Sequence, residues 1–345
     1  MFKVFVLAFF ILSSEIVFLK YFDKSLLFYI NNSKVNAIAY NKSQRRVFNV
    51  IRNINQNNMD STKSVYIFGA SSTREFFDLE ENLNKDVESN LYKKVYISAT
   101  SSQSLVDSLR LIDNINTPNS LVILGISPKK FWSEDPSYLE LSYLTYGKYL
   151  KYPVISNSIK ELYEEYSFND YFNLRLLPPA SNTFLYLIKD YVLEQLQNIK
   201  RHGLFAYKMY DITVSEQHVK GYTKQLSDDE LMQLENKFEA QHMQNTEKNL
   251  EFNLNVLRKI IDISRKKELK IVLFDIPLNP LIDELYHNQY QEYIARIDNI
   301  KNIKHVRYKE KSKSNHFHDT SHLNAIGKEE NREYMINGLH YAMDF

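Results

Sequence analysis

Two short stretches of the chain combine residue types that can carry out nucleophilic chemistry. GASS at residues 69–72 follows a strand-like run, and HFHDTSHLNAIG at residues 316–327 holds Asp319 and His322 three positions apart. A serine becomes a useful nucleophile when a histidine takes its proton, and the histidine needs a carboxylate to orient it. In a tight turn, the spacing of Asp319 and His322 lets the carboxylate reach one ring nitrogen. We therefore predict a catalytic triad of Ser71, His322 and Asp319.

The first stretch also has simpler interpretations. Small hydroxylated residues after a strand often cap a helix, so Ser71 and Ser72 could serve only that purpose. Ser71 is preferred as the nucleophile because it alone lies two residues after Gly69, and Ser72 remains the alternative. Gly69 is expected to let the chain turn sharply at the strand end. Arg74 and Glu75 are interpreted as charges in the first turn of a helix, with substrate contact as the alternative.

The second stretch invites a metal-binding alternative, because His316, His318, Asp319 and His322 are all potential ligands. Metallo-β-lactamase-type sites use the order His-x-His-x-Asp-His, whereas here the aspartate directly follows the second histidine. Such a motif should also follow an early strand and not close the chain. We therefore predict no metal and no cofactor, and we interpret His316 and His318 as loop residues.

Composition excludes several function classes. The 345 residues are 44% apolar and 25% charged, as in a folded globular chain, and the net charge of +1 gives no indication of nucleic-acid binding. The chain has no cysteine, which excludes disulfides, thiolate metal sites and a cysteine nucleophile.

The amino-terminal segment is apolar enough to target a membrane. Residues 4–12 form an apolar run, Ser13, Ser14 and Glu15 interrupt it before the apolar residues 16–19, and no small-x-small cleavage site follows. We expect residues 1–22 to form an uncleaved signal anchor, a transmembrane helix that attaches the protein to the membrane. A cleaved signal and a buried soluble helix are the alternatives. Residues 23–60 are polar and rich in asparagine and lysine, which indicates a stalk.

The remainder, residues 61–345, has the pattern of an α/β domain. Strand-like apolar runs alternate with segments long enough for helical crossovers, which predicts a five-stranded parallel sheet with helices on both faces. The expected strands are residues 64–68, 94–98, 121–126, 270–277 and 303–308. Between the third and fourth strands, residues 132–250 read as a helical insertion. In it, Ser227 is a plausible helix cap.

Individual segments give further expectations. Residues 102–114 should form a helix with Leu105, Leu109 and Ile112 on one face. Residues 325–342 should form a closing helix that Asn324 caps.

The turn after the third strand is expected to lie near the site. In open α/β sheets, ligands bind beyond the carboxyl ends of the strands, at the point where the strand order reverses. Phe131 and Trp132 are interpreted as an apolar cover under the insertion, with stacking on a sugar as the alternative. Lys129 and Lys130 are interpreted as a solvated turn.

The two blocks together resemble the SGNH or GDSL-type hydrolases. The first block of that family is a strand followed by Gly-Asp-Ser, and here Gly69-Ala70-Ser71 has alanine in place of aspartate. The last block is Asp-x-x-His before a helix, matched by residues 319–322. FGASSTRE and DTSHLNAIG look most like the membrane-anchored cell-envelope branch, which includes proteins of alginate, peptidoglycan and teichoic acid O-acylation. The resemblance implies a flavodoxin-like SGNH sheet.

The resemblance also implies an oxyanion hole. The family's second block supplies a glycine N–H, for which Ser102 is the best equivalent here, and Ser71 supplies its own N–H. The third block is Gly-x-Asn-Asp, and here Gly125 is present while Ser127 stands at the asparagine position. Backbone N–H groups serve whatever the side chain, but a serine hydroxyl is shorter than an asparagine amide.

By this resemblance, the protein is expected to be a serine-dependent esterase or O-acyltransferase. Its substrate would be a cell-envelope glycan, and its soluble domain would be periplasmic or extracellular. The expected partners are an acyl donor and a membrane-bound O-acyltransferase. A non-catalytic SGNH-like scaffold that binds glycan or such an acyltransferase is the alternative, and convergence of Ser71, Asp319 and His322 would discriminate between them.

Overall fold

A computed structural model of the chain describes residues 42–77, 83, 92–139, 142, 157–166, 226–243, 245–301, 303–308 and 312–344. These residues belong to two compact units, and each is considered by itself. The first unit includes residues 42–56, which lie in helix α2 (Lys42–Asp60), and helix α8 (Asn157–Tyr166). The second unit contains the sheet and all the predicted site residues.

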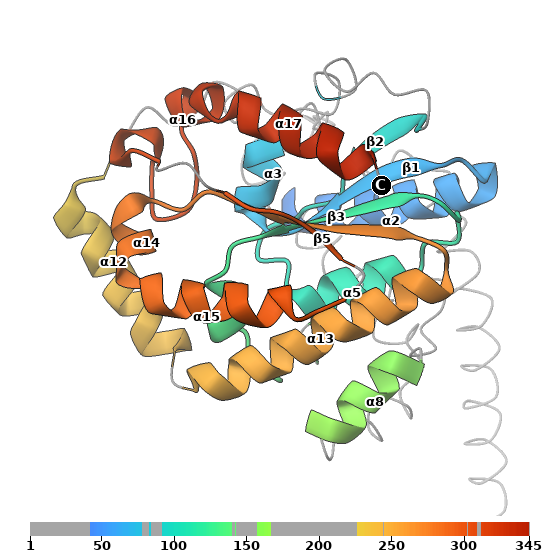
Figure 1. Ribbon diagram of the computed structural model, residues 1–345, viewed down its shortest axis with the longest axis horizontal. Helices are drawn as coiled ribbons and strands as arrows, with labels where there is room; N and C mark the ends of the chain where they lie inside the picture. The colour runs from blue at the N-terminus through green and yellow to red at the C-terminus, as the bar shows by residue number, and fades with distance from the viewer. Residues whose placement is uncertain are drawn as a thin grey trace, which may run out of the picture. The chain divides into compact units, whose positions relative to one another are not determined.

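The second unit is built on a five-stranded parallel sheet with the order β2-β1-β3-β4-β5 (Figure 1). The strands are β1 (Ser64–Phe68), β2 (Lys94–Ile97), β3 (Leu121–Ile126), β4 (Lys270–Asp275) and β5 (Lys304–Val306). The predicted α/β class with five parallel strands is therefore confirmed. The largest difference in length is at β5, an edge strand that pairs only with Val272–Phe274 among the described residues.

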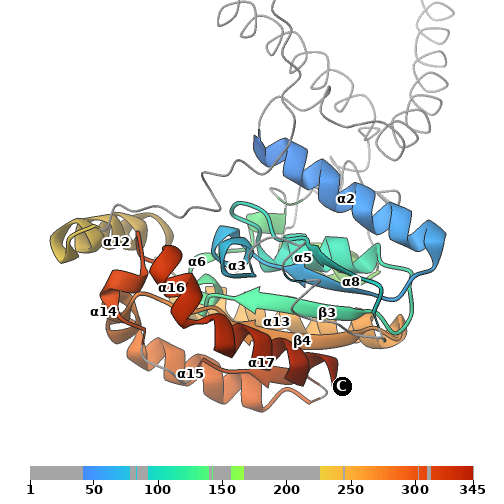
Figure 2. The ribbon, with the colours of Figure 1, turned by 90° about the horizontal axis from the view of Figure 1, so that it is seen from above.

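Helices cover both faces of this sheet, as Figures 1 and 2 show. On one face lie α3 (Ser71–Phe77) and α17 (Arg332–Met343), and on the other lie α5 (Leu105–Asp113), α13 (Thr246–Lys266) and α15 (His287–Asp298). Alternate residues of a strand point to opposite faces. Phe274 of β4 points to the face covered by α3, where its ring centroid lies 5.0 Å from that of Phe77. Because both faces are covered, β1 and β3 are buried at every residue.

Local sequence signals set the start of helix α5, which lies at Leu105 instead of the predicted residue 102. Helix α5 buries Leu105, Leu109 and Ile112, which confirms its predicted face. It begins at a capping box in which the Ser104 side chain accepts from the Asp107 N–H, while the Asp107 carboxylate accepts from the Ser104 N–H.

The end of the chain forms two helices where one was predicted. These are α16 (Ala325–Glu330) and α17, and Asn331 separates them. The Asn331 side chain donates to the Gly327 carbonyl at 2.8 Å, and the same carbonyl accepts from the Asn331 N–H at 3.1 Å. Asn324 caps α16 as predicted, because its side chain accepts from the Gly327 N–H.

The described part of the predicted insertion is helical. It contains the second half of α6 (Lys130–Ser133), α8, α12 (Asp228–His242) and the start of α13. Ser227 caps α12 through a capping box with Glu230, which confirms the predicted cap.

The predicted anchor, residues 1–22, lies outside the described residues, as does the stalk up to residue 41. Residues 42–60 of that stalk are helical. No helix of the described part of the chain combines the length and apolar character needed to cross a membrane.

Candidate active site

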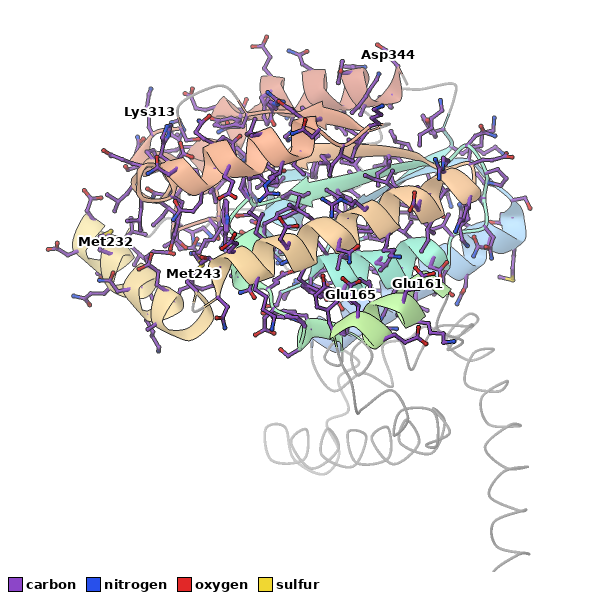
Figure 3. The ribbon with its side chains drawn as sticks, turned by 60° about the horizontal axis from the view of Figure 1, so that its bottom comes forward. Glu161, Glu165, Met232, Met243, Lys313 and Asp344 are labelled. Carbon is purple, nitrogen blue, oxygen red and sulfur yellow. The ribbon has the colours of Figure 1, made fainter. Side chains whose placement is uncertain are left out.

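The candidate site lies at the carboxyl edge of the sheet, where the strand order reverses between β1 and β3. Ser71 is the first residue of α3, which follows β1 after only Gly69 and Ala70. Helices α12, α14 (Pro280–Leu285) and α16 stand at the same end of the unit (Figure 2). In Figure 3, the labelled side chains of Lys313, Met232 and Met243 mark this end.

Two glycines let α3 begin this close to the sheet. Gly69 has a φ of +146°, which confirms the predicted sharp turn, and a Cβ there would lie 2.2 Å from Thr73 Oγ1. A Cβ on Gly125 of β3 would lie 2.2 Å from Thr73 Cγ2. Thr73 therefore fills the space between the two glycines, and its hydroxyl donates to the Gly125 carbonyl at 3.0 Å. This packing fixes the first turn of α3, and with it Ser71, against the end of β3.

A closed loop presents the other two residues. An isolated bridge between Phe317 and Leu323 joins its ends, and the His318 N–H donates to the His322 carbonyl at 3.1 Å. Inside the loop, Asp319 Oδ1 accepts from the N–H groups of Ser321 and His322, each at 2.8 Å. The Asp319 carboxylate is therefore held by the backbone of its own loop.

The structure brings Ser71, His322 and Asp319 together. His322 Nδ1 lies 2.7 Å from Asp319 Oδ2, and His322 Nε2 lies 2.9 Å from Ser71 Oγ. Since the carboxylate accepts a hydrogen bond from Nδ1–H, the neutral ring has its lone pair at Nε2, facing the serine hydroxyl. Ser72, the alternative nucleophile, is buried, and its side chain makes no hydrogen bond to His322 in the part of the chain described.

The charges of this trio are mutually stabilised. Burial alone would raise the pKa of Asp319, but the hydrogen bonds and charge of His322, with the two backbone N–H groups, lower it to about 2. For His322, burial acts to lower the pKa, and the Asp319 carboxylate outweighs it and raises the pKa above the ordinary value. The arrangement thus favours a histidine that takes up a proton from Ser71.

Comparison with known proteins identifies no family for this chain. No family model matches the chain, and a search of curated proteins finds no relative. The interpretation of this site therefore depends on its geometry and on the two sequence blocks.

The predicted oxyanion-hole residues lie at the same edge of the sheet. Ser102 is exposed in the turn after β2 with a φ of 56°, and Ser127 is buried directly after β3. The segment after β2 runs beside the start of α3, because the Thr100 N–H donates to the Gly69 carbonyl at 3.1 Å. Neither Ser102 nor Ser127 makes a hydrogen bond to the trio within the residues described. Their role stays a prediction.

The interpretation of Lys129 and Lys130 as a solvated turn is wrong. Lys129 makes an ion pair with Glu235 of α12 and lies 3.7 Å from the centroid of the Phe238 ring. Lys130 donates to the Gln103 carbonyl and pairs with Glu134 at 2.8 Å. Both ammonium groups are only partly exposed because α12 and the turn before α5 close over them. Burial lowers the pKa of Lys129, against the opposing effect of the Glu235 carboxylate.

Phe131 and Trp132 are buried, which confirms their interpretation as an apolar cover. Phe131 packs on Tyr293 of α15, with ring centroids 4.9 Å apart. Asn249 and Asn253 of α13 donate to the carbonyls of Trp132 and Phe131, so this segment lies under the helices that follow the insertion.

Among the described residues, only part of the histidine–aspartate cluster has its potential metal ligands close together. Ligand atoms of His318, Asp319 and His322 lie within 4.8 Å of one another, whereas His316 is not in this group. The chemistry of these donors would suit a zinc ion. However, His322 Nδ1 and Asp319 Oδ2 are already joined by a hydrogen bond, which a metal ion would have to replace.

Sequence reasoning missed the partners of the trio. Glu75 and His318, interpreted as a helix charge and a loop residue, lie beside it, with Glu75 Oε2 3.5 Å from His318 Nε2. A signal was present, because Glu75 follows Ser71 by four residues, the spacing that places two side chains on one helix face.

Proposed function

We propose that this protein carries out serine-dependent acyl chemistry, as an esterase or an O-acyltransferase that acts on a cell-envelope glycan. The observation that carries the proposal is the continuous chain of contacts from Ser71 Oγ through the His322 ring to Asp319 Oδ2, at 2.9 Å and 2.7 Å. These are hydrogen-bond distances, and the order of groups is that of a nucleophile, its base and the carboxylate that orients the base.

The geometry supports a two-step mechanism. Ser71 Oγ attacks the acyl carbonyl while His322 Nε2 takes its proton, and Asp319 stabilises the imidazolium that forms. As the tetrahedral intermediate collapses, His322 gives the proton to the leaving oxygen and an acyl-serine remains. Water, or a sugar hydroxyl in a transferase, then attacks the acyl group with His322 as its base.

The developing oxyanion needs hydrogen-bond donors, and three are proposed. Ser71 begins α3, so its N–H is not required for a bond inside the helix. The N–H of Ser102 and the hydroxyl of Ser127 come from the turns after β2 and β3 at the same edge. Because Ser127 stands in place of an asparagine amide, stabilisation by this group is expected to be weaker and turnover slow.

Fold and sequence blocks support assignment to the SGNH-like hydrolases of the cell envelope. The strand order β2-β1-β3-β4-β5 is that of flavodoxin-like sheets, with the site at the β1/β3 switch point. The proposal includes the helical insertion at 132–250 and an N-terminal membrane anchor at 1–22. It places the soluble domain in the periplasm or outside the cell, where glycan, an acyl donor and a membrane-bound O-acyltransferase would be its partners.

Covalent labelling of the serine tests the proposal. An activated fluorophosphonate or an aryl acetate should modify Ser71 in the wild type, and Ser71→Ala should abolish labelling. Ser72→Ala is the matched control and should retain most of it. His322→Ala should be nearly as damaging as Ser71→Ala, because members of a triad act as a unit. Labelling that survives Ser71→Ala, or is indifferent to His322→Ala, would reject the triad and favour a non-catalytic scaffold.

A further inference from the structure

A second carboxylate and a second imidazole lie beside the proposed triad. Glu75 follows Ser71 by four residues on α3, and His318 precedes His322 by four residues in the closed loop. Helix α3 therefore presents Ser71 and Glu75 on one face, and the loop presents His322 and His318 opposite them. Ser71 faces His322 in one pair, and Glu75 faces His318 in the other.

The two pairs are in contact with each other. The rings of His318 and His322 are stacked, with centroids 5.5 Å apart and planes inclined by 15°. His318 Nε2 lies 3.5 Å from Glu75 Oε2, and His318 Nδ1 lies 3.8 Å from Asp319 Oδ2. The side chains of Glu75 and His318 are only 14% and 13% exposed, so this arrangement is largely shielded from water.

The titratable and charged groups around His322 come from three elements. Its own loop contributes Asp319 and His318, and α3 contributes Glu75 together with Arg74, whose guanidinium lies 3.4 Å from Glu75 Oε1. The turn after β3 adds Lys129, whose charge acts on Asp319.

The neighbouring charged groups hold the Glu75 carboxylate in its ionised form. Burial alone would raise the pKa of Glu75, but His318, His322 and Arg74 together lower it below the ordinary value. The negative charge of Glu75 in turn favours the protonated form of His322, against the opposing charge of Arg74.

We propose that Glu75 and His318 are positioning residues, a second carboxylate–imidazole pair that stabilises the protonated form of His322 and holds its ring toward Ser71. Glu75 acts by charge, and His318 acts by packing flat against His322 while it holds the Glu75 carboxylate in place.

The part played in acylation depends on the proposed function. When Ser71 Oγ forms its bond to the acyl carbon, its proton moves to His322 Nε2, and the imidazolium then lies near two carboxylates instead of one. Asp319 contacts the Nδ1 side and Glu75 adds a second negative charge from α3. When the intermediate collapses, the same proton moves to the leaving oxygen. The effect on the proton affinity of His322 does not depend on any substrate.

The first experiment therefore measures His322 directly, by NMR titration of the full chain with labelled histidine. The His322 signal is assigned by its loss in His322→Gln. The pKa of His322 should fall in Glu75→Gln, recover in large part in Glu75→Asp, and remain unchanged in Glu333→Gln, an exposed control on α17. Signals of the other histidines show that the variants are folded. A His322 pKa that is equal in Glu75→Gln and the wild type would overturn the proposal.

The second experiment follows the pH profile of Ser71 labelling by a fluorophosphonate. In Glu75→Gln the acid limb should move to lower pH, because a His322 with a lower pKa stays neutral down to a lower pH, and the plateau rate should fall about fivefold. A purely structural role would lower the plateau without moving the limb, and that result would contradict the proposal. If Ser71 is not labelled at all, the proposed function fails, while the titration still tests the pair.

The role of His318 is tested by a double-mutant cycle on the same titration. If His318 holds Glu75 in place, Glu75→Gln should change the His322 pKa less in a His318→Gln background than in the wild type. An undiminished effect would remove His318 from the pair.

Discussion

Substitution of Asp319 by asparagine tests the charge arrangement of the site with little change in shape. In the wild type, Asp319 Oδ2 accepts from His322 Nδ1, so Nε2 is free to take the Ser71 proton. The amide of Asp319→Asn can instead place its NH2 group toward Nδ1. The ring would then carry its proton on Nε2, where it cannot act as a base for Ser71.

The size of the effect follows from the pKa of Asp319. This pKa is about 2 instead of the ordinary 3.8, which corresponds to roughly 2 kcal/mol of interaction with its surroundings. The carboxylate is 28% exposed, so solvent screening reduces the figure to about 1–2 kcal/mol. Loss of that amount from the imidazolium-like transition state would slow acylation by about 5- to 30-fold. The unfavourable tautomer adds to this, so we expect a loss of at least about 30-fold.

The assay is the second-order rate constant for fluorophosphonate labelling on the alkaline plateau of the pH profile, where the rate no longer changes with pH and His322 is neutral. Asp262→Asn, an exposed site on α13, is the control for the same chemical change and should leave the rate unaltered. Thermal melting should show that both variants are folded. A reduction of less than about threefold in folded Asp319→Asn would show that Asp319 does not orient the base.

Three further predictions concern pH, backbone and metal. Labelling requires neutral His322, so the labelling rate should rise with pH around the pKa of His322, which Asp319 raises above 6.5. In Asp319→Asn this rise should occur at lower pH. Gly69→Ala should lower the free energy of unfolding, measured by urea denaturation, by about 2 kcal/mol or more, because φ is +146° and a Cβ would meet Thr73. Ala70→Ser is the control. An equal loss of stability in both variants would contradict the role of Gly69 in the turn. Chelators should leave labelling unchanged, whereas stoichiometric zinc that is lost in His318→Ala would favour a metal site.

Local signals in the sequence predict the strands of the sheet and the members of the trio, but not that Ser71 and His322 meet across 251 positions. The strand runs are apolar and bounded by turn residues, and strands buried on both faces leave just such runs. Ser71 is identified by its place after Gly69, and the tight spacing of Asp319 and His322 encodes their contact within one loop. These inferences succeed because each depends on residues close together in the chain.

Other features depend on contacts between distant segments and leave little local trace. Lys129 has the composition of a solvated turn, yet it is covered by Glu235 and Phe238, which come from α12 more than a hundred residues later. Likewise, nothing in the neighbourhood of Glu75 indicates that His318 will lie against it. Buried charges of this kind are set by tertiary structure, which periodicity and capping rules do not describe.

The separation between Ser71 and His322 has a consequence for how the protein is made. The two residues are 251 positions apart, and the sheet must form before they can meet. At synthesis rates of about 5–20 residues per second, Ser71 leaves the ribosome roughly 10–50 seconds before His322 exists. During that interval the serine is an ordinary alcohol, unable to react with acyl donors it encounters. On the proposed mechanism, a chain cut short anywhere before residue 322 would stay inert, and reactivity would appear only in molecules whose synthesis and folding have both been completed.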